Sequence, residues 1–243
     1  RTDHSSVYKM VNTPRGSVVF NKDRLTLKFI YGEAFRGPSN WDYSAGYGND
    51  NLKPEDAKSY ELFAGYRFSN NLSGDICLYQ NEIQNRLFKY SDAVSYRWIN
   101  KGELNINGLE LSTNYKLNSL ELGCNYTYNE SEDENGIDVP EIAKHGANVG
   151  ATYSFTKNIK LNVRENYLGR RKNNTSTSIS EREYIGEAFV SHTTLSALNY
   201  HNFDFYFSVK NLFDTEYYHT SNTSVTEYRQ PQRTFMLKTT YKF

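Results

Sequence analysis

The sequence lacks any long apolar run, although it is rich in aromatic rings. A helix that crosses a bilayer needs about 20 consecutive apolar residues, and no stretch of this 243-residue chain approaches that length. The sequence therefore predicts no membrane helix. This shortage leaves a membrane-spanning β-barrel open, because barrel strands alternate apolar and polar residues and average to a polar hydropathy.

Net charge, proline and cysteine are also scarce. The chain has 28 Lys and Arg against 28 Asp and Glu, so its net charge is zero, and it has no basic run. A nucleic-acid-binding protein is therefore not expected. Only five Pro are present, while aromatic residues make up 15% of the chain, with 21 Tyr and 14 Phe. This composition favours β structure over disorder, since disordered segments contain few aromatic residues.

The cysteines and histidines indicate neither a disulfide nor a metal site. Cys77 and Cys124 are expected on opposite faces of the predicted sheet, Cys77 among polar neighbours and Cys124 among apolar ones, which argues against a bridge between them. The histidines match no metal-ligand spacing, although contact between a loop histidine and haem stays open: His145, His192, His201 and His219. The sequence therefore predicts no bound metal and no resident cofactor.

The final eleven residues, Arg233 to Phe243, give the clearest structural signal. Apolar and aromatic side chains recur at every second position and share one face of a strand, whereas lysine and threonine take most of the other face. The printed sequence stops on an aromatic residue without a polar tail. A strand with lipid on one side and a wet lumen on the other has this pattern.

Similar alternation recurs along the chain, with turns of two lengths. Short turns near residues 22, 70, 118, 157 and 201 alternate with long connections at 34–56, 91–96, 129–145, 171–184 and 213–231. Strands are expected at 17–20, 24–33, 57–68, 72–90, 98–117, 120–128, 146–155, 159–167, 185–199, 203–210 and 233–243, with a weak one near 7–11. The pattern predicts an all-β, antiparallel, up-and-down transmembrane barrel wall of about 11–12 strands, with short periplasmic turns, long extracellular loops and aromatic girdles at the strand ends.

Three other classes of protein compete with this interpretation. A soluble up-and-down barrel or a β-sheet adhesin would also alternate, but neither explains the asymmetry of the loops. An outer-membrane hydrolase would need a Ser/His/acid constellation. Ser191 and His192 are adjacent, so their side chains point to opposite faces of a strand, and no Gly-x-Ser-x-Gly turn is present. No catalytic residue and no enzymatic activity are therefore predicted.

Five ordered segments resemble landmarks of the TonB-dependent outer-membrane receptors. Tyr31–Ser39 resembles the family's "FRAPS" segment, and Val209–Tyr217 resembles its "NLFD..Y" block. The other three are Asn51–Glu55 with Ser59–Leu62, Asn100–Gly102 with Asn107–Glu110, and the closing Gln230–Phe243, in which Gln232 replaces the usual Gly. The landmarks cover nearly the whole chain, which makes the resemblance specific even though each segment alone is weak.

The resemblance implies a particular place and role for residues 1–243. Such receptors have about 22 strands and a plugged lumen, so the chain is expected to form the C-terminal portion of the barrel domain in the outer membrane of a Gram-negative bacterium. The plug domain and the N-terminal segment that engages TonB are expected outside these residues. The implied function is active uptake of a scarce nutrient, such as an iron–siderophore, haem or cobalamin. A passive porin-like channel is the alternative.

Candidate contact residues follow from position in the predicted wall. Aromatic side chains of the first long loop and a basic cluster in a later one are expected to bind the ligand: Trp41, Tyr43 and Tyr47, with Arg170 and Arg171. Ordinary exposed loop composition is the other interpretation. Charged side chains expected to face the lumen could contact a plug or simply hydrate the wall: Asp75, Glu110, Arg164 and Lys210.

Overall fold

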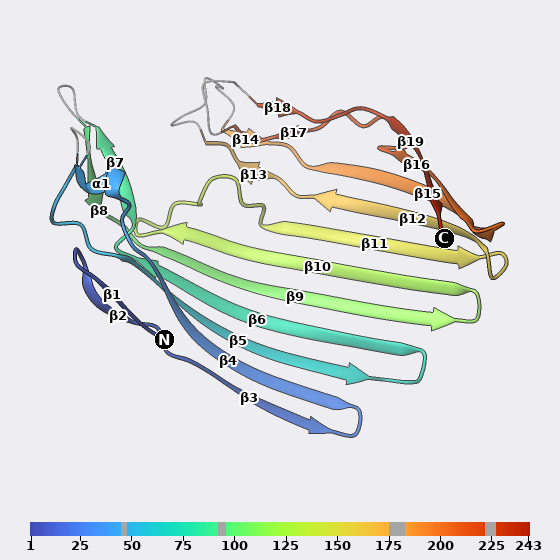
Figure 1. Ribbon diagram of the computed structural model, residues 1–243, viewed down its shortest axis with the longest axis horizontal. Helices are drawn as coiled ribbons and strands as arrows, with labels where there is room; N and C mark the ends of the chain where they lie inside the picture. Colours follow the sequence, from blue (N-terminus) through green and yellow to red (C-terminus); the bar gives the residue numbers. More distant parts are fainter. Residues whose placement is uncertain (45–47, 92–95, 175–182, 222–226) are drawn as a thin grey trace. The chain divides into compact units, whose positions relative to one another are not determined.

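A computed structural model describes residues 1–44, 48–91, 96–174, 183–221 and 227–243 (Figure 1). Within these residues, eleven strands form one sheet in the order β19-β16-β15-β12-β11-β10-β9-β6-β5-β4-β3, so the main strands are neighbours in the order of the chain. Their bounds are β3 (Arg15–Lys22), β4 (Leu25–Arg36), β5 (Glu55–Arg67), β6 (Leu72–Gln84), β9 (Leu104–Leu117), β10 (Leu120–Asp133), β11 (His145–Ser154), β12 (Ile159–Leu168), β15 (Ala188–Tyr200), β16 (Phe203–Lys210) and β19 (Thr234–Tyr241). This topology confirms the predicted all-β, antiparallel, up-and-down arrangement.

Short elements occupy the stretches between the main strands and before the first of them. Four two-stranded hairpins and one short helix occur in the described residues: β1 (Thr2–Ser5) with β2 (Lys9–Asn12), β7 (Leu87–Ser91) with β8 (Tyr96–Asn100), β13 (Arg171–Lys172) with β14 (Tyr184–Ile185), β17 (Tyr218–His219) with β18 (Tyr228–Arg229), and α1 (Asn40–Ser44). No helix in the described part of the chain is long and apolar enough to cross a membrane.

Several predicted boundaries were wrong. The strand expected at 72–90 is divided into β6 and β7, and Asn85 between them has a φ of 54°. The strand expected at 98–117 is divided into β8 and β9 around Gly102, where φ is 88°. A left-handed residue breaks the regular pairing of a strand, and at both positions the chain leaves the main sheet for the hairpin of β7 and β8. The weak strand expected near 7–11 is instead part of a hairpin.

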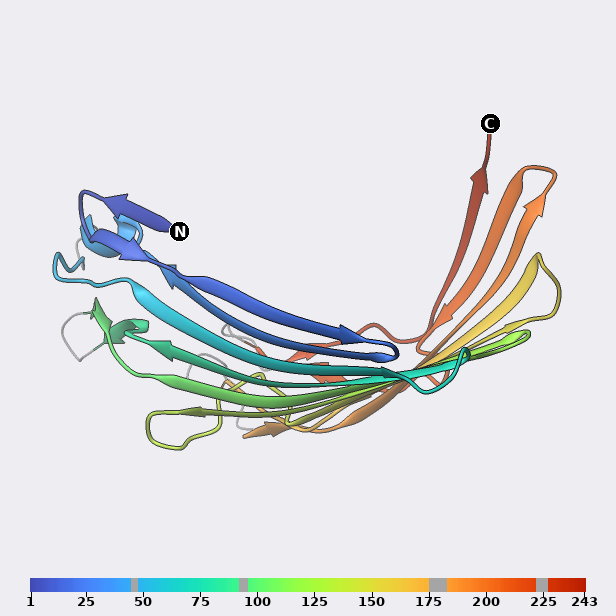
Figure 2. The same ribbon diagram turned by 90° about the horizontal axis from the view of Figure 1, so that it is seen from below.

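The chain divides into two compact units. Unit 1 contains residues 1–64, 77–108 and 130–139, and unit 2 contains residues 65–76, 109–129 and 140–243. In unit 1, β3 and β4 pair side by side (Figure 2) with Val18 opposite Phe29 and Phe20 opposite Leu27. These four side chains share a face on which Val18 is 69% exposed and Phe29 is 48% exposed. Unit 1 therefore presents an uncovered apolar face.

Unit 2 separates apolar and polar side chains between its two faces. One row of directly opposed residues reads Tyr153, Leu161, Leu195, Phe207 and Leu237 across β11, β12, β15, β16 and β19. Phe207 is 46% exposed and Leu237 is 72% exposed, so this face is no sealed interior. The adjacent row on the other face is mainly polar, and its members are hydrogen-bonded: Thr152 with Asn162, and Thr194 with Ser208. The predicted alternation is confirmed.

Aromatic side chains on the apolar face of unit 2 gather at both strand ends. Near the short turns, ring pairs lie about 5 Å apart, namely Tyr66–Phe68, Tyr153–Phe155 and Phe203–Tyr241. Near the long connections, Tyr167 packs on Phe189 at 4.8 Å. Tyr167 is opposite Ala147, and Ala147 is six positions from Tyr153 along β11, which corresponds to about 20 Å at the rise of a strand. That spacing suits the apolar band of an outer-membrane barrel, about 25 Å tall.

Buried apolar side chains are few and lie beneath the long connections. In the described residues they are Leu52, Leu104, Ile185, Ala188, Val190 and Val209. Each lies at or near the end of a main strand that leads into a long connection. The packed part of each unit therefore supports the loop bases, while the strands between the two ends stay uncovered on their apolar face.

Candidate ligand-binding site

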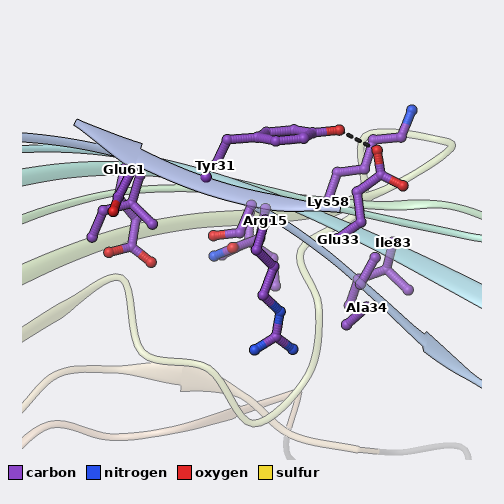
Figure 3. A pocket seen from close by; sticks show the side chains of 15 residues that line it. Arg15, Tyr31, Glu33, Ala34, Lys58, Glu61 and Ile83 are labelled. Carbon is purple, nitrogen blue, oxygen red and sulfur yellow. Dashed lines mark hydrogen bonds between the residues drawn. The ribbon is translucent and has the colours of Figure 1, made fainter. Parts of the chain in front are cut away.

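A cavity of about 830 Å³ lies in unit 1, where β3, β4, β5, β6 and β9 approach the long connections (Figure 3). Arg15 and Glu61 lie on one side of the strands, and the Tyr31 hydroxyl donates a hydrogen bond to Glu33 on the other side. Apolar side chains complete the lining: Ile30, Ala34, Ala57, Ile83 and Ile106. The cavity therefore combines an apolar floor with a few charged groups, as small-molecule sites commonly do.

Asn100 fixes the loop bases beside this cavity. Its side-chain amide donates to the carbonyls of Lys53 (2.9 Å) and Asn85 (2.7 Å), and its Oδ1 accepts from the Lys53 backbone N–H at 2.7 Å. Two of the family landmarks, Asn51–Glu55 and Asn100–Gly102, are thus tied to each other across 47 residues of chain. The landmark asparagine has a structural function that its sequence context does not reveal.

The first landmark is joined to the second by an ion pair. Arg36 at the end of β4 contacts Glu55 at the start of β5, with 2.7 Å between nitrogen and oxygen. Beyond Arg36, the Asp42 carboxylate accepts hydrogen bonds from the N–H (2.7 Å) and hydroxyl (2.9 Å) of Ser39. This resembles a capping box, in which a serine and an acidic residue three positions later close the first turn of a helix. The ion pair ties the adjoining ends of β4 and β5 together, and the Ser39–Asp42 hydrogen bonds fix the first turn of α1.

Asn211 organises the corresponding connection in unit 2. Its side chain donates to the carbonyls of Thr215 (2.8 Å) and Pro231 (3.3 Å) and accepts from the Thr215 N–H at 2.8 Å. Asn211 is only 2% exposed and has a φ of 52°, a left-handed conformation that asparagine tolerates. Asp214 accepts from the Arg233 N–H at 2.7 Å. The fourth and fifth landmarks are therefore held to each other by these hydrogen bonds.

The predicted aromatic contact residues lie at the first long connection. Trp41 is on α1 and is 69% exposed, which leaves its ring free to contact a ligand. Tyr43 is on the same helix, but its hydroxyl is buried and has no hydrogen-bond partner among the described residues. Burial raises the pKa of the Tyr43 phenol. Tyr47 lies outside the described residues.

The two predicted basic residues of the later loop lie in different environments. Arg170 is exposed and stacks on the Tyr184 ring, with its guanidinium carbon 3.8 Å from the ring centre. Arg171 is 9% exposed and donates to the carbonyl oxygens of Tyr218 (2.5 Å) and Gly169 (3.4 Å). Burial lowers the pKa of Arg171. Arg171 therefore joins β13 to β17, whereas Arg170 is the exposed member of the pair.

The four predicted lumen residues lie in unit 2. Asp75 accepts a hydrogen bond from the Ser112 hydroxyl at 2.6 Å. Glu110 is exposed and, two residues before Ser112 on β9, shares its face. Arg164 and Lys210 both occupy the face opposite to Phe207 and Leu237, and each is directly opposed to His192. The residues that the sequence did not single out are Arg15, Glu61 and the isoleucines of the cavity, because no local motif marks them.

The cysteines agree with the prediction, since Cys77 and Cys124 are both free thiols. Among the described residues, no three His, Cys, Asp or Glu side chains are grouped closely enough to hold a metal ion.

Comparison with known proteins identifies the family. The family model described as "TonB dependent receptor-like, beta-barrel" matches residues 1–212. The chain is 26% identical over 229 residues to the vitamin B12 transporter BtuB of Vibrio cholerae, covering 89% of this chain and 34% of that protein. It is 27% identical over 253 residues to BtuB of Photobacterium profundum, covering 100% of this chain and 40% of that protein.

Solved structures show the same fold. The ferric enterobactin receptor PfeA of Pseudomonas aeruginosa has a TM-score of 0.85 at 19% identity, covering 100% of this chain and 42% of that one. The siderophore receptor PirA of Acinetobacter baumannii has a TM-score of 0.85 at 18% identity, with the same coverage. The chain thus spans 34% to 42% of the lengths of these proteins. It belongs to the TonB-dependent receptor family and forms part of the β-barrel wall in the outer membrane of a Gram-negative bacterium.

Proposed function

We propose that this chain is part of a receptor that takes up a scarce nutrient across the outer membrane, with energy supplied through TonB. The observation that carries the proposal is the cavity of about 830 Å³ beside the long connections of unit 1. Its volume lies within the range of small-molecule sites, about 300–1,000 Å³. The relatives are named transporters and receptors, and a passive porin-like channel finds no support in these comparisons.

Among the nutrients that the family resemblance suggests, a cobalamin-type ligand has the most support. The sequence relatives are named vitamin B12 transporters. The named ferric enterobactin receptor, by contrast, supports the shared fold alone at 19% identity. The cavity also suits a ligand with a broad apolar body and a few polar substituents, since Ile30, Ile83 and Ile106 line it beside Arg15 and Glu61.

The proposal includes two sets of contacts. The exposed Trp41 ring, in the connection between β4 and β5, would contact the ligand, because an aromatic ring gives a large contact area at a low cost in side-chain entropy. Asp75, Glu110, Arg164 and Lys210 would face a plug domain in the lumen, since the polar face of unit 2 is the side away from lipid. The hydrogen bond from Ser112 holds Asp75 in place for such a contact.

Uptake assays test the proposal. Cells producing the full-length protein that contains this chain would be given radiolabelled cyanocobalamin, with ferric enterobactin and haemin as competitors, in strains with and without TonB. We expect cyanocobalamin uptake that requires TonB. Neither ferric enterobactin nor haemin should inhibit this uptake appreciably. Uptake that is equal in both strains would overturn the proposal in favour of a passive channel.

A matched pair of variants tests the site. Trp41→Ala is expected to weaken ligand binding by about tenfold, which corresponds to the loss of one aromatic anchor. Tyr200→Ala is the control, because Tyr200 is 65% exposed, close to the 69% of Trp41, but lies at a short turn. Equal binding by both variants would exclude Trp41 from the site.

A further inference from the structure

The hairpin of β1 and β2, which precedes β3, has one tip side chain that packs elsewhere in unit 1. Its strands, Thr2–Ser5 and Lys9–Asn12, pair antiparallel, and Tyr8 lies in the turn between them. Val7 is 51% exposed and Met10 is 63% exposed, whereas Tyr8 is half-buried. The tip of the hairpin is therefore open to solvent on both sides of Tyr8, while the Tyr8 ring itself is covered.

The Tyr8 ring packs on the end of β4, where the first long connection begins. It meets the Phe35 ring edge to face, with 5.8 Å between the ring centres. It also covers Gly37, the first residue after β4, so closely that a Cβ on Gly37 would stand 2.7 Å from Cε1 of Tyr8. Carbon atoms in contact are normally 3.5–4.0 Å apart. The ring therefore occupies the space that a side chain at position 37 would need.

Gly37 is explained by this close approach and not by its backbone conformation. Among the described glycines, Gly102 and Gly136 have a positive φ and Gly37 does not. Gly37 also precedes Pro38, which favours an extended conformation that any residue adopts. The "FRAPS" segment that this stretch resembles has alanine at the same place. The departure from that segment is accounted for by the Tyr8 ring, which leaves no room for a methyl group.

Tyr8 also lies near the helix α1 that carries Trp41. The hydroxyl of Tyr43 on α1 is buried, and its pKa, raised mainly by that burial, is raised further by the nearby Tyr8 phenol. Gly37 and Tyr43 stand on either side of Trp41 along the chain. The Tyr8 ring is thus close to the segment that carries Trp41 both before and after it.

The helix α1 depends on such outside contacts for its conformation. It has only five residues, Asn40–Ser44, and an isolated helix of that length is not stable in water. The hydrogen bonds between Ser39 and Asp42 fix its first turn. Trp41 is 69% exposed, so its own packing contributes little to its orientation. The position of the Trp41 ring is therefore set by whatever holds the backbone on both sides of it.

We propose that Tyr8 is a positioning residue for the ligand-binding site. Its packing on Phe35 and Gly37, here called the Tyr8 contact, holds the start of the first long connection and so presents Trp41 to the ligand. Tyr8 acts through Trp41 and does not touch the ligand itself. Without the Tyr8 contact, the ligand has to order the connection as it binds, which lowers its affinity. The inference rests on the proposed function, in which Trp41 contacts the nutrient.

Two measurements on the full-length protein in detergent test the inference. Calorimetric titration with cyanocobalamin gives the affinity, and hydrogen exchange of the Asp42 and Tyr43 amides, which donate to the Ser39 carbonyl at 3.0 and 3.3 Å, reports the order of α1. Tyr8→Ala is expected to speed exchange of both amides and to weaken binding about fivefold. Tyr8→Phe retains the ring and should restore both to wild-type values. Gly146→Ala is the control, because its methyl group meets nothing within 4 Å.

Two double variants show how Tyr8 acts. Gly37→Ala should displace the ring and match Tyr8→Ala, but it should have no further effect when Tyr8 is already alanine, because the methyl group then has room. Tyr8→Ala should not weaken binding further in a Trp41→Ala protein, although it should still speed exchange of the α1 amides. A residue that contacts the ligand directly would weaken binding in both backgrounds.

The outcomes separate the possible explanations. Wild-type exchange of the α1 amides in Tyr8→Ala would overturn the inference, as would a Tyr8→Phe variant that behaves like Tyr8→Ala. An effect of Gly37→Ala that is equally large with and without the Tyr8 ring would also overturn it. So would a loss of affinity from Tyr8→Ala that persists in full without the Trp41 ring. Faster exchange in Tyr8→Ala, together with no cyanocobalamin binding by the wild type, would support the Tyr8 contact and count against the proposed function alone.

Discussion

Replacement of Asn211 is the sharpest test of how the long connections are held. Asn211→Ala removes three side-chain hydrogen bonds, to Thr215 twice and to Pro231 once. Each is worth about 1 kcal/mol net. Alanine at a φ of 52° adds about 1 kcal/mol of backbone strain. The free energy that holds the connection closed is therefore expected to fall by about 4 kcal/mol.

Glycine at the same position separates the two contributions. Asn211→Gly loses the same hydrogen bonds but adopts the left-handed conformation without strain, so the expected loss is about 3 kcal/mol. Amide hydrogen exchange of the protein in detergent would measure both variants. The backbone N–H of Gln230 donates to the carbonyl of Tyr217 across the connection at 3.0 Å, so its exchange reports opening of the connection. It should exchange about 100-fold faster or more in the glycine variant, and faster still in the alanine variant.

The control for this experiment is Asn70→Ala, at a short turn where the side chain is exposed. It should leave exchange of the Gln230 amide unchanged. If Asn211→Ala exchanged like the wild type, the hydrogen bonds of Asn211 would not be what closes the connection. If the alanine and glycine variants were identical, the strain part of the reasoning would be refuted.

Two further predictions concern packing and an orphan hydroxyl in unit 1. Gly108→Ala should destabilise the protein by about 1–2 kcal/mol in urea unfolding, because a Cβ at this position would stand 2.1 Å from the Tyr79 ring. Gly146→Ala meets nothing within 4 Å and should change stability little. Tyr43→Phe should stabilise the α1 region by up to about 1 kcal/mol, since it removes a buried hydroxyl without a partner. Because burial raises the pKa of Tyr43, the folded segment binds the phenol proton more tightly than the unfolded segment does. In the wild type, protection of the α1 amides from hydrogen exchange should therefore fall as pH rises above about 10. Tyr43→Phe should not show this fall.

The alternation of side chains and the spacing of turns were sufficient to predict the sheet. Phe207 and Leu237 alternate with polar residues in the sequence, and the structure places them opposite each other on one exposed face. This succeeds because the side-chain period of a strand is two residues, so a pattern on one strand fixes the face of every residue on it. Short turns then fix the pairing of successive strands.

The loop bases were not predictable in the same way. Asn100 acts through Lys53, which is 47 residues away, and no local pattern announces such a contact. Arg170 and Arg171 are adjacent and chemically identical, yet one is exposed and the other is buried. The end of β6 at Gln84 also escaped prediction, because the apolar residues continue beyond it into β7. In each case the outcome depends on tertiary contacts rather than on local periodicity.

The hydrogen-bonded asparagines described here also bear on how such a receptor changes over generations. Asn211 secures its connection at the base, through backbone carbonyls and an amide rather than through the side chains of the loop above it. Sequence beyond that anchor can lengthen, shorten or exchange residues while the anchor and the strand pairing below stay intact. New ligand preferences can therefore arise by replacement of a loop, without changes in the strands that carry it.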